Sequence, residues 1–326
     1  MPGIGVVFNP KSRQNLRDPG GALRLARRLG SYGAVREARS MEDLAEIAED
    51  FRRENIDVLA ISGGDGTNTV TLSGFASAYA AAPLPRVALL RGGTMNTVAN
   101  SIGVRRASPE LLLGHLVDTY ARDGADALPI KRRYTMRVSS SGALPTHVQV
   151  GFLFGTGVVH GFLAEYYATG APSPAAAAKL LVRGSASAFV GGSTIRRIAA
   201  PFRGTVTLEN GAQWIERDYL AVAAGTIAHI GLGFRPFYRF TERGDAGGGF
   251  QVLGIHATAA GFVAELGRVY RGQPMRPGVA YDAVTSHMVV HGVAGPIGYM
   301  IDGDLHASAG PVEVRTGPRV RLVVTP

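Results

Sequence analysis

The first third of the chain alternates short apolar runs with segments of helical periodicity. The apolar runs predict buried strands, because a fully buried strand needs no polar alternation. The segments between them repeat apolar residues every three or four positions, as an amphipathic helix does. Strands alternating with helices predict right-handed crossovers and a parallel sheet. The predicted strands span residues 4–8, 56–62 and 87–90, and the predicted helices span residues 21–29, 40–51 and 67–80.

The second of these helices has the clearest start signal. Ser40 is an N-cap candidate, and Asp43 follows three residues later, as in a capping box. One apolar face then runs along the helix. Its members are Leu44, Ile47, Ala48 and Phe51.

Polar turns follow the predicted strands. They are Asn9–Pro10, Gly63–Thr67 and Arg91–Thr94. In an open parallel sheet, ligands bind outside the carboxyl ends of the strands. We therefore expect the three turns to converge on one rim of the sheet.

The pattern changes from about Lys131 onward. Short β-branched segments separated by glycines predict an antiparallel β domain, interrupted by two helical patches. One patch covers 158–167 and continues beyond the loop expected at Gly170–Pro174, and the other covers 258–269. The predicted strands are 134–139, 146–150, 204–208, 219–224, 251–256, 286–291 and 320–324, and the continuation of the first helical patch is 179–189.

The turn Gly63-Gly64-Asp65-Gly66-Thr67 restricts the chemistry most. Glycines remove the Cβ atoms that would prevent close approach or positive φ, so successive N–H groups can hold phosphate oxygens. A carboxylate beside phosphates would order a cation or water, or take a proton from an attacking hydroxyl. The alternative is a plain glycine turn with an Asx cap.

The second glycine turn, Gly92-Gly93-Thr94-Met95-Asn96-Thr97, comes one βα unit later. Thr94 can donate from its hydroxyl, and Asn96 stands at the start of a helix whose N-terminal N–H groups we expect to be free. The alternative is a cap in which Asn96 bonds locally. Two phosphate-facing loops are therefore expected side by side. The strand end Asn9–Arg13 adds an amide, a hydroxyl and two cations, but it lacks the spacing of a P-loop.

Two carboxylates flank a glycine near the end of the chain, in Asp302-Gly303-Asp304. Alternate side chains of an extended segment share a face, so Asp302 and Asp304 could approach one site, although Gly303 could bend them apart. The pair could divide cation binding from proton transfer. The alternative is an Asp-Gly-Asp turn between two strands.

Composition narrows the alternatives further. The 326 residues allow two domains, and the 46% of hydrophobic residues fit a folded globular protein. The chain has no cysteine, no HExxH zinc spacing and no Gly-x-Ser-x-Gly elbow. A formal charge of +9 favours anionic partners such as a nucleotide or an anionic lipid surface. Without a signal peptide or membrane span, we expect a soluble cytoplasmic protein.

Together these motifs resemble the diacylglycerol kinase catalytic-domain family, which includes bacterial soluble lipid kinases and sphingosine kinases. Gly63–Thr67 matches the family's Gly-Gly-Asp-Gly-Thr, and Gly93–Ala99 resembles its Gly-Thr-x-Asn-Asp-Phe-Ala. Asn9–Ser12 resembles Asn-Pro-x-Ser-Gly, with Arg13 in place of the glycine. The later matches are Gly231–Pro236, Asp302–Asp304 at the position of Asp-Gly-Glu, and Pro311–Val314 in the closing strand.

The resemblance implies an α/β fold. An N-terminal α/β nucleotide-binding domain like that of phosphofructokinase and NAD kinase would cover 1–128, completed by about 308–326. A C-terminal antiparallel β-sandwich for the lipid would cover 129–307, with the active site in the cleft. Phe152, Phe154, Phe162, Tyr166 and Tyr167 could line an acyl pocket there, although core packing explains most of them.

The implied reaction transfers the γ-phosphoryl group of ATP, with Mg²⁺, to a lipid hydroxyl. Asp304 would take the position of the catalytic base, with Asp65 as the rival base and Asp302 beside them. Asp245 is the candidate metal ligand, and Asp65 is the alternative. The candidate nucleotide-binding residues are Asn9, Pro10, Lys11, Ser12, Ser40, Gly63, Gly64, Asp65, Gly66, Thr67, Gly93, Thr94 and Asn96.

Three departures from the family pattern keep alternatives open. Aspartate at 304 is one methylene shorter than glutamate, Thr97 replaces an aspartate, and Asp245 alone represents an acidic metal-water stretch. NAD kinase is the alternative enzyme, and a catalytically inactive nucleotide- or lipid-binding regulator is the alternative of another class. The expected partners are nucleotide, lipid and, transiently, the inner membrane surface, with no nucleic acid. A homodimer stays open.

Overall fold

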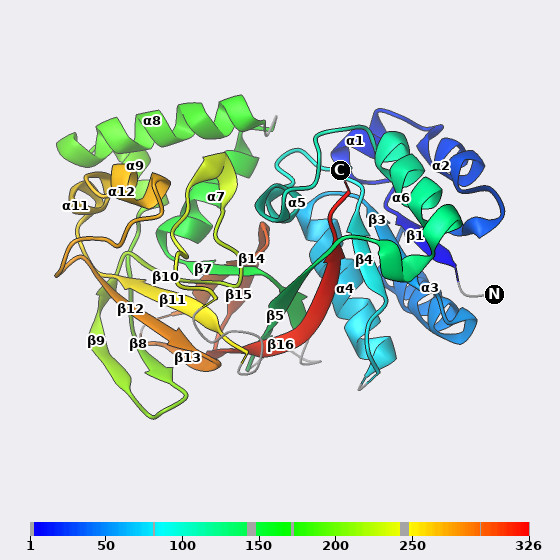
Figure 1. Cartoon of the computed structure of the whole chain (residues 1–326). Helices are drawn as coiled ribbons and strands as arrows, with labels where there is room; N and C mark the ends of the chain where they lie inside the picture. The colour runs from blue at the N-terminus through cyan, green and yellow to red at the C-terminus, as the bar shows by residue number, and fades with distance from the viewer. Residues whose placement is uncertain are drawn as a thin grey trace. The chain divides into compact units, whose positions relative to one another are not determined.

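The structure is a computed structural model that describes residues 3–80, 82–141, 148–170, 173–241, 248–293 and 295–325 (Figure 1). The chain divides into two compact units. The first unit comprises Met1–Arg133 and Pro318–Pro326, and the second comprises Tyr134–Gly317. The chain passes from one unit to the other within strand β5 (Ile130–Ser140) and again within strand β16 (Val312–Val323). The assignment of nucleotide to one domain and lipid to the other stays a prediction.

The first unit is built on a parallel sheet. Its strands follow the order β2, β1, β3, β4 and the end of β16, and the paired registers between neighbours are parallel. The three apolar runs form β1, β3 and β4, as predicted. Strand β2 was not predicted, because its exposed, mixed residues form the edge of the sheet and show no apolar run. The strands are β1 (Ile4–Phe8), β2 (Gly33–Glu37), β3 (Val58–Ser62) and β4 (Arg86–Leu89).

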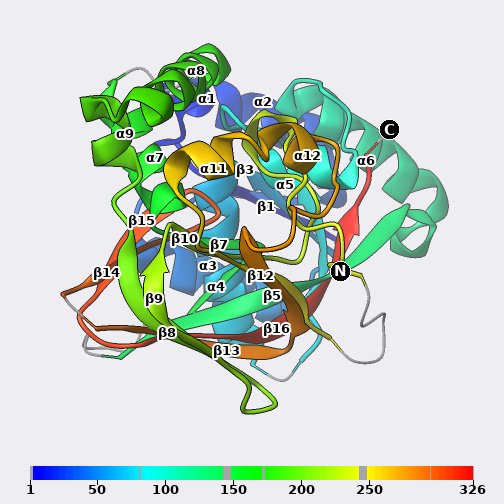
Figure 2. The same ribbon diagram turned by 90° about the vertical axis from the view of Figure 1, so that its left-hand side faces the viewer.

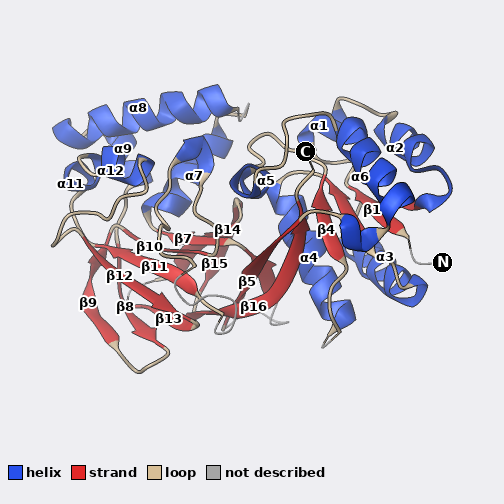
Figure 3. Cartoon of the chain, viewed as in Figure 1, coloured by secondary structure: helices blue, strands red, loops and turns tan. Residues whose placement is uncertain are grey.

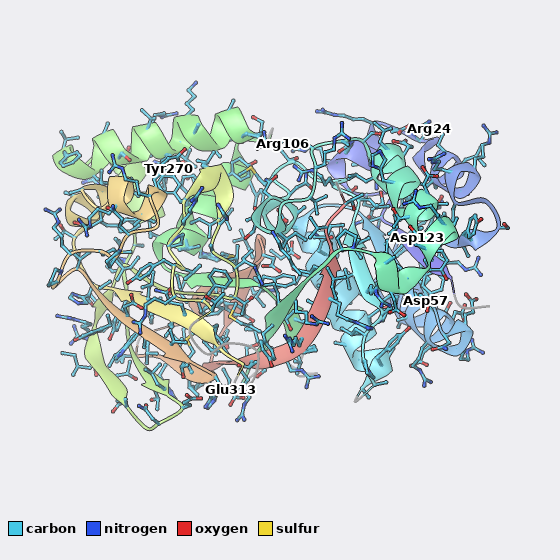
Figure 4. The ribbon with its side chains drawn as sticks, in the orientation of Figure 1. Arg24, Asp57, Arg106, Asp123, Tyr270 and Glu313 are labelled. Atoms are coloured by element: carbon cyan, nitrogen blue, oxygen red, sulfur yellow. The ribbon has the colours of Figure 1, made fainter. Side chains whose placement is uncertain are left out.

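Helices cover both faces of this sheet. Helices α2 and α6 pack together on one face, and α3 and α4 pack together on the other (Figure 3). Arg24 of α2, labelled in Figure 4, pairs with Glu110 of α6, with 3.2 Å between Nε and Oε1. The helices are α1 (Arg13–Leu16), α2 (Gly21–Leu29), α3 (Met41–Glu54), α4 (Asp65–Tyr79), α5 (Thr97–Ile102) and α6 (Pro109–Asp123).

Helix α3 forms as its sequence predicts. The Ser40 hydroxyl accepts a hydrogen bond from the Asp43 N–H at 3.1 Å, which satisfies one of the free donors in the first turn. The four apolar positions predicted to face the core are its buried residues. Local capping and apolar spacing therefore agree, and both point to the same helix.

The second unit contains two antiparallel layers of strands. In one layer β13 lies between β16 and β8, β9 continues beyond β8, and β5 pairs with β16 and β6. The other layer has the order β12, β11, β10, β7, β14, β15. The strands not yet given bounds are β6 (Gln149–Gly151), β7 (Leu153–Thr156), β8 (Phe202–Leu208), β9 (Gln213–Tyr219), β10 (Ala221–Gly225), β11 (Phe250–Ile255), β12 (Ala280–Thr285), β13 (His287–Gly292), β14 (Ile297–Ile301) and β15 (Asp304–Ser308).

Side chains from both layers form one buried core. It includes Val206 and Val290 from the first layer, and Phe154, Val252 and Ile301 from the second. Two packed sheets of this kind are a β-sandwich. The parallel first unit and the antiparallel second unit confirm the predicted fold class.

Helices lie over the outer face of the second layer (Figures 1 and 2). Leu220, Ala221 and Ile255 are buried there against residues that include Val158 and Phe262. The predicted helix over 258–269 divides in two, because the Glu265 N–H donates to the Phe262 carbonyl three residues earlier and the α-helical pattern is interrupted there. The helices are α7 (Val158–Ala168), α8 (Pro174–Val190), α9 (Ser193–Ile198), α11 (Ala259–Val263) and α12 (Leu266–Tyr270).

Helix α8 begins earlier than the sequence pattern predicts. We expected a loop around Gly170–Pro174 and a helix from 179, but the helix starts at Pro174, and residues 171 and 172 lie outside the described part. The Ser173 hydroxyl accepts from the Ala176 N–H at 3.1 Å. Proline at the first helical position costs no hydrogen bond, so the Ser-Pro pair begins the helix.

Candidate nucleotide site and the predicted acidic residues

The turns at the carboxyl ends of β1, β3 and β4 contact one another in the first unit. Asn9 Nδ2 donates to Thr67 Oγ1 at 2.9 Å, and the Ser12 hydroxyl donates to the Gly92 carbonyl at 3.3 Å. Asn15 Nδ2 donates to the Ser62 carbonyl at 3.1 Å. These bonds connect three turns that are distant in sequence. The expected convergence of the turns on one rim is present.

The glycines at this rim allow the turns to approach each other closely. A Cβ atom on Gly93 would lie 2.3 Å from the Gly64 Cα, and one on Gly92 would lie 2.8 Å from the Gly63 nitrogen. Real Cβ contacts are not this short, so side chains at 92 and 93 would separate the turns. None of these four glycines has positive φ. Close approach, and not a left-handed backbone, is the reason that glycine is needed here.

The N-terminus of α4 is the part of the rim that can receive an anion. Gly64 is the N-cap residue, and no side chain caps the helix. The N–H groups of the first turn have no partner within a helix, and the helix dipole adds to their attraction for negative charge. Within the described residues, Asn68 Oδ1 in the same helix is also buried without a hydrogen-bond partner. This turn therefore has unused donors and an unused acceptor.

Asp65 accepts two backbone hydrogen bonds that the sequence did not predict. Its carboxylate accepts from the Thr97 N–H at 2.9 Å and from the Val98 N–H at 3.3 Å. These are the first N–H groups of α5, which we expected to be free. These N–H groups are bound because a carboxylate at a helix N-terminus accepts their hydrogen bonds and interacts favourably with the helix dipole. Asp65 thus connects the first glycine turn to the second.

Burial raises the pKa of the Asp65 carboxyl, although the Thr97 and Val98 N–H groups, the Thr97 hydroxyl and the charge of Arg91 each lower it. Thr97 stands where the family has aspartate. A hydroxyl at 97 supports the Asp65 carboxylate, whereas a second carboxylate there would repel it.

Arg91 was predicted only as the first residue of the turn at 91–94 and not as a buried residue of the site. Its side chain is buried and donates to the Val104 carbonyl at 3.2 Å and to Asn100 Oδ1 at 2.8 Å. Burial lowers the pKa of its guanidinium, repulsion from Arg106 lowers it further, and Asp65 opposes both. Its φ of 55° lies in the left-handed region, which is uncommon for a residue with a side chain. Arginine before a glycine pair carries no recognised signal, so nothing in the sequence marked it.

The other candidate nucleotide residues divide into structural and exposed groups. Asn96 bonds locally, since its Nδ2 donates to the Gly93 carbonyl at 2.7 Å and its Oδ1 accepts from the Gly93 N–H at 3.2 Å. Lys11 Nζ donates to the Arg39 carbonyl at 2.6 Å. Ser40 caps α3, as described above. Thr94, by contrast, is exposed on the second turn and is placed to meet a ligand.

The Asp302 carboxylate bonds to backbone N–H groups within the second unit. The carboxylate is buried and accepts from the Phe152 N–H at 3.0 Å and from the Leu153 N–H at 2.8 Å. Asp302 and Gly303 have φ values of 45° and 102°, and Ile301 pairs with Asp304 across the turn. This is a two-residue hairpin turn with left-handed backbone at both positions. The segment is therefore not extended, and the two carboxylates do not share a strand face.

Asp304 begins β15 and stays partly exposed. The preceding Gly303 carbonyl accepts from the Tyr167 hydroxyl at 2.8 Å, which connects this turn to α7. Of the two carboxylates at this turn, Asp304 is the one that solvent can reach. Its role as the base stays a prediction.

The aromatic residues predicted near an acyl pocket mostly belong to the core. Phe152, Phe154 and Tyr166 are buried, and Phe162 packs against the cluster around Tyr166. Tyr167 is exposed and holds the turn before Asp304. Core packing accounts for most of this set, as expected from the sequence.

The described residues contain no group of three or more acidic, histidine or cysteine side chains placed to hold a metal ion. Asp245, the candidate ligand, lies outside the described residues. Asp65 is occupied by backbone N–H groups. No helix in the described part of the chain is long and apolar enough to cross a membrane.

The first unit is an α/β domain in which glycine turns meet at the carboxyl ends of parallel strands. Residues 3–125 match the family model of the diacylglycerol kinase catalytic domain. The resemblance predicted from the motifs is confirmed. A search of curated proteins found no match.

Solved structures share the fold over nearly the whole chain. A putative diacylglycerol kinase from Bacillus anthracis str. Sterne has a TM-score of 0.66 at 15% identity, covering 99% of this chain and 97% of that chain. A diacylglycerol kinase structure from the same organism has a TM-score of 0.60 at 14% identity, with the same coverage. Yeast NADH kinase, solved with NADH, has a TM-score of 0.50 at 10% identity and covers 100% of this chain and 84% of that chain. At these identities the likeness concerns the fold alone.

Proposed function

We propose that the protein is a lipid kinase that transfers the γ-phosphoryl group of ATP to a lipid hydroxyl. The observation that carries this proposal is the uncapped N-terminus of α4, which stands beside paired glycine turns in the part of the chain that matches the kinase family. Backbone N–H groups there would bind phosphate oxygens. The exposed Thr94 hydroxyl would add a further donor.

Asp304 is the proposed proton acceptor. As the lipid oxygen bonds to the γ-phosphorus, its proton would pass to this carboxylate and the bond to the leaving ADP would break. Asp65 is less suited to this role, because two backbone N–H groups already bind its oxygens. We infer that Asp65 positions the second glycine turn and that it does not accept the proton.

Mg²⁺ would neutralise phosphate charge, as it does in other phosphoryl transfers. Within the described residues, no three acidic, histidine or cysteine side chains are placed to hold the ion. The requirement for Mg²⁺ is tested by comparing turnover with added magnesium and with a chelator.

The experiment supplies labelled ATP and magnesium together with either mixed lipid micelles or NAD. Label in the extracted lipid supports the proposal. Label in NADP alone would refute it in favour of NAD kinase. The chain shares its fold with the yeast NADH kinase. Nucleotide binding without transfer to either acceptor would indicate an inactive binding protein.

Two variants then locate the base. Asp304→Asn should bind ATP with unchanged affinity and lose nearly all turnover. Asp118→Asn, an exposed carboxylate of α6 paired with Arg28, is the matched control and should keep full activity. If Asp304→Asn keeps full activity, the assignment is wrong and Asp65 becomes the candidate base.

A further inference from the structure

Helix α8 presents an apolar strip to solvent. Val182, Phe189 and Val190 have exposed fractions of 69%, 66% and 81%. Lys179 and Arg183 are exposed beside them. Positions separated by three, four, seven and ten or eleven residues lie on one side of a helix, so these residues form a continuous strip. We call Lys179, Val182, Arg183, Phe189 and Val190 the α8 strip.

The opposite side of α8 is apolar as well. Ala177 and Leu180 are buried in a cluster with Tyr166 and Ile198, and Gly184 is buried on the same side. The figures show α8 on the outside of the helical layer of the second unit (Figures 1 and 2). Helix α8 thus carries large apolar residues on two opposite sides, and among the described residues of this unit only one of these sides is covered. The α8 strip therefore fits a second apolar environment.

The charges around the α8 strip have one sign. From Tyr166 to Leu208 the sequence contains no aspartate or glutamate, and its cations are Lys179, Arg183, Arg196, Arg197 and Arg203. Glu165, whose pKa Arg183 lowers, is already paired with Arg197 at 2.7 Å. The partner of this surface should therefore have an apolar interior and an anionic surface.

We propose that the α8 strip is the surface by which the protein lies on an anionic lipid bilayer. Helix α8 would lie parallel to the membrane, with Val182, Phe189 and Val190 in the acyl boundary and Lys179 and Arg183 among the anionic headgroups. The described chain has no helix that could span the bilayer, so contact in the membrane plane is the form of binding that fits.

A second copy of the chain fits the strip less well. A two-fold symmetric contact through α8 would bring the strip against itself. The cations Lys179 and Arg183 of one copy would then lie close to the same cations of the other copy, and no carboxylate on the helix would compensate them. Like charges in such a contact are repulsive. The strip is complementary to an acidic surface and not to its own copy.

The test measures binding of the full chain to sedimented vesicles, without nucleotide or lipid substrate. The wild-type protein should bind vesicles of phosphatidylglycerol and phosphatidylcholine, and it should bind less at higher salt or with phosphatidylcholine alone. Phe189→Ser combined with Val190→Ser should lower the partition coefficient about tenfold or more. Ile215→Ser is the matched control, because Ile215 is 61% exposed on β9 beside acidic residues, and it should change nothing.

Charge variants test the second half of the proposal. Lys179→Glu combined with Arg183→Glu should lower binding to the acidic vesicles about tenfold or more and remove most of its salt dependence. Arg27→Glu combined with Arg122→Glu makes the same change in net charge on exposed helices of the first unit and should have a much smaller effect. Circular dichroism spectra that match the wild type would show that each variant is folded.

Three results would overturn the proposal. The wild-type protein could fail to bind acidic vesicles, or it could bind them with no effect of the α8 variants. It could also form a dimer in solution that Phe189→Ser abolishes, which would make a second copy the occupant. Because the measurement uses no ATP, membrane binding and the proposed kinase reaction can fail independently.

Discussion

Removing the Asp65 carboxylate should loosen α5 more than any other helix of the first unit. In Asp65→Ala, the N–H groups of Thr97 and Val98 lose the acceptors that now lie 2.9 and 3.3 Å away. A hydrogen bond to a charged group contributes about 1.5–3 kcal/mol, and relief of the buried charge offsets part of this. We expect a net loss of about 1–3 kcal/mol in the free energy of unfolding, measured by urea denaturation.

The local effect is measured by amide hydrogen exchange. If the lost bonds hold the first turn of α5 closed, exchange at Thr97 and Val98 should quicken about 10- to 100-fold, because each 1.4 kcal/mol is a factor of ten. Ser40→Ala is the matched control, since it removes a cap from α3 and should quicken exchange at Asp43 instead.

The pH dependence gives a second readout. The pKa of Asp65 is raised in the folded state, so between its ordinary value of 3.8 and the folded value the folded protein holds more protons than the unfolded chain. The free energy of unfolding contributed by this group therefore falls as pH rises through the folded pKa. Asp65→Asn should lack this fall. If Asp65→Ala abolishes ATP binding but leaves exchange at Thr97 and Val98 unchanged, Asp65 faces the ligand and our interpretation is wrong.

Three further variants test other contacts. Gly93→Ala should lower both stability and ATP affinity, with about 1–3 kcal/mol lost in the free energy of unfolding, because its Cβ would lie 2.3 Å from the Gly64 Cα. Denaturation and ATP titration measure this, and unchanged values would show that the turns can separate freely. Glu265→Gln should lower the free energy of unfolding by about 3 kcal/mol in urea denaturation, because the fully buried Glu265 side chain pairs with Arg276. The pKa of Glu265 is lowered in the folded protein, so this stabilisation should be present above pH 4.5 and be lost as pH falls through the folded pKa. Asp302→Ala should destabilise the second unit by about 2–4 kcal/mol in the same assay, since it leaves two buried N–H groups without acceptors.

The parts of the fold that local sequence determines were predictable. Helix α3 has its cap, its acidic first turn and its apolar face within fifteen residues, from Ser40 to Glu54, and all agree with the structure. Strands β1, β3 and β4 were predicted because burial on both faces makes them continuously apolar. Strand β2 was not predicted, because an edge strand in contact with water need not be apolar.

The candidate site was predictable in its location but not in its internal bonds. Glycine turns after parallel strands indicated the rim, because the carboxyl ends of parallel strands meet there. The sequence could not show that Asp65 would bind N–H groups more than thirty residues away, or that Arg91 would be buried beside it. In Asp302–Asp304, the choice between an extended segment and a turn depends on backbone angles, and Asp-Gly permits both.

Strand β16 has a consequence for how this chain folds as it is synthesised. Leu322 pairs with Val87 of β4, so the first unit obtains this strand 235 residues later in the chain (322 − 87). A nascent chain that ends near residue 133 would contain the whole family match but would leave the outer edge of β4 unpaired. Such an edge can pair with another chain and aggregate. We therefore expect residues 1–133 to need protection on the ribosome until β16 emerges, and a fragment limited to residues 1–133 to be poorly soluble.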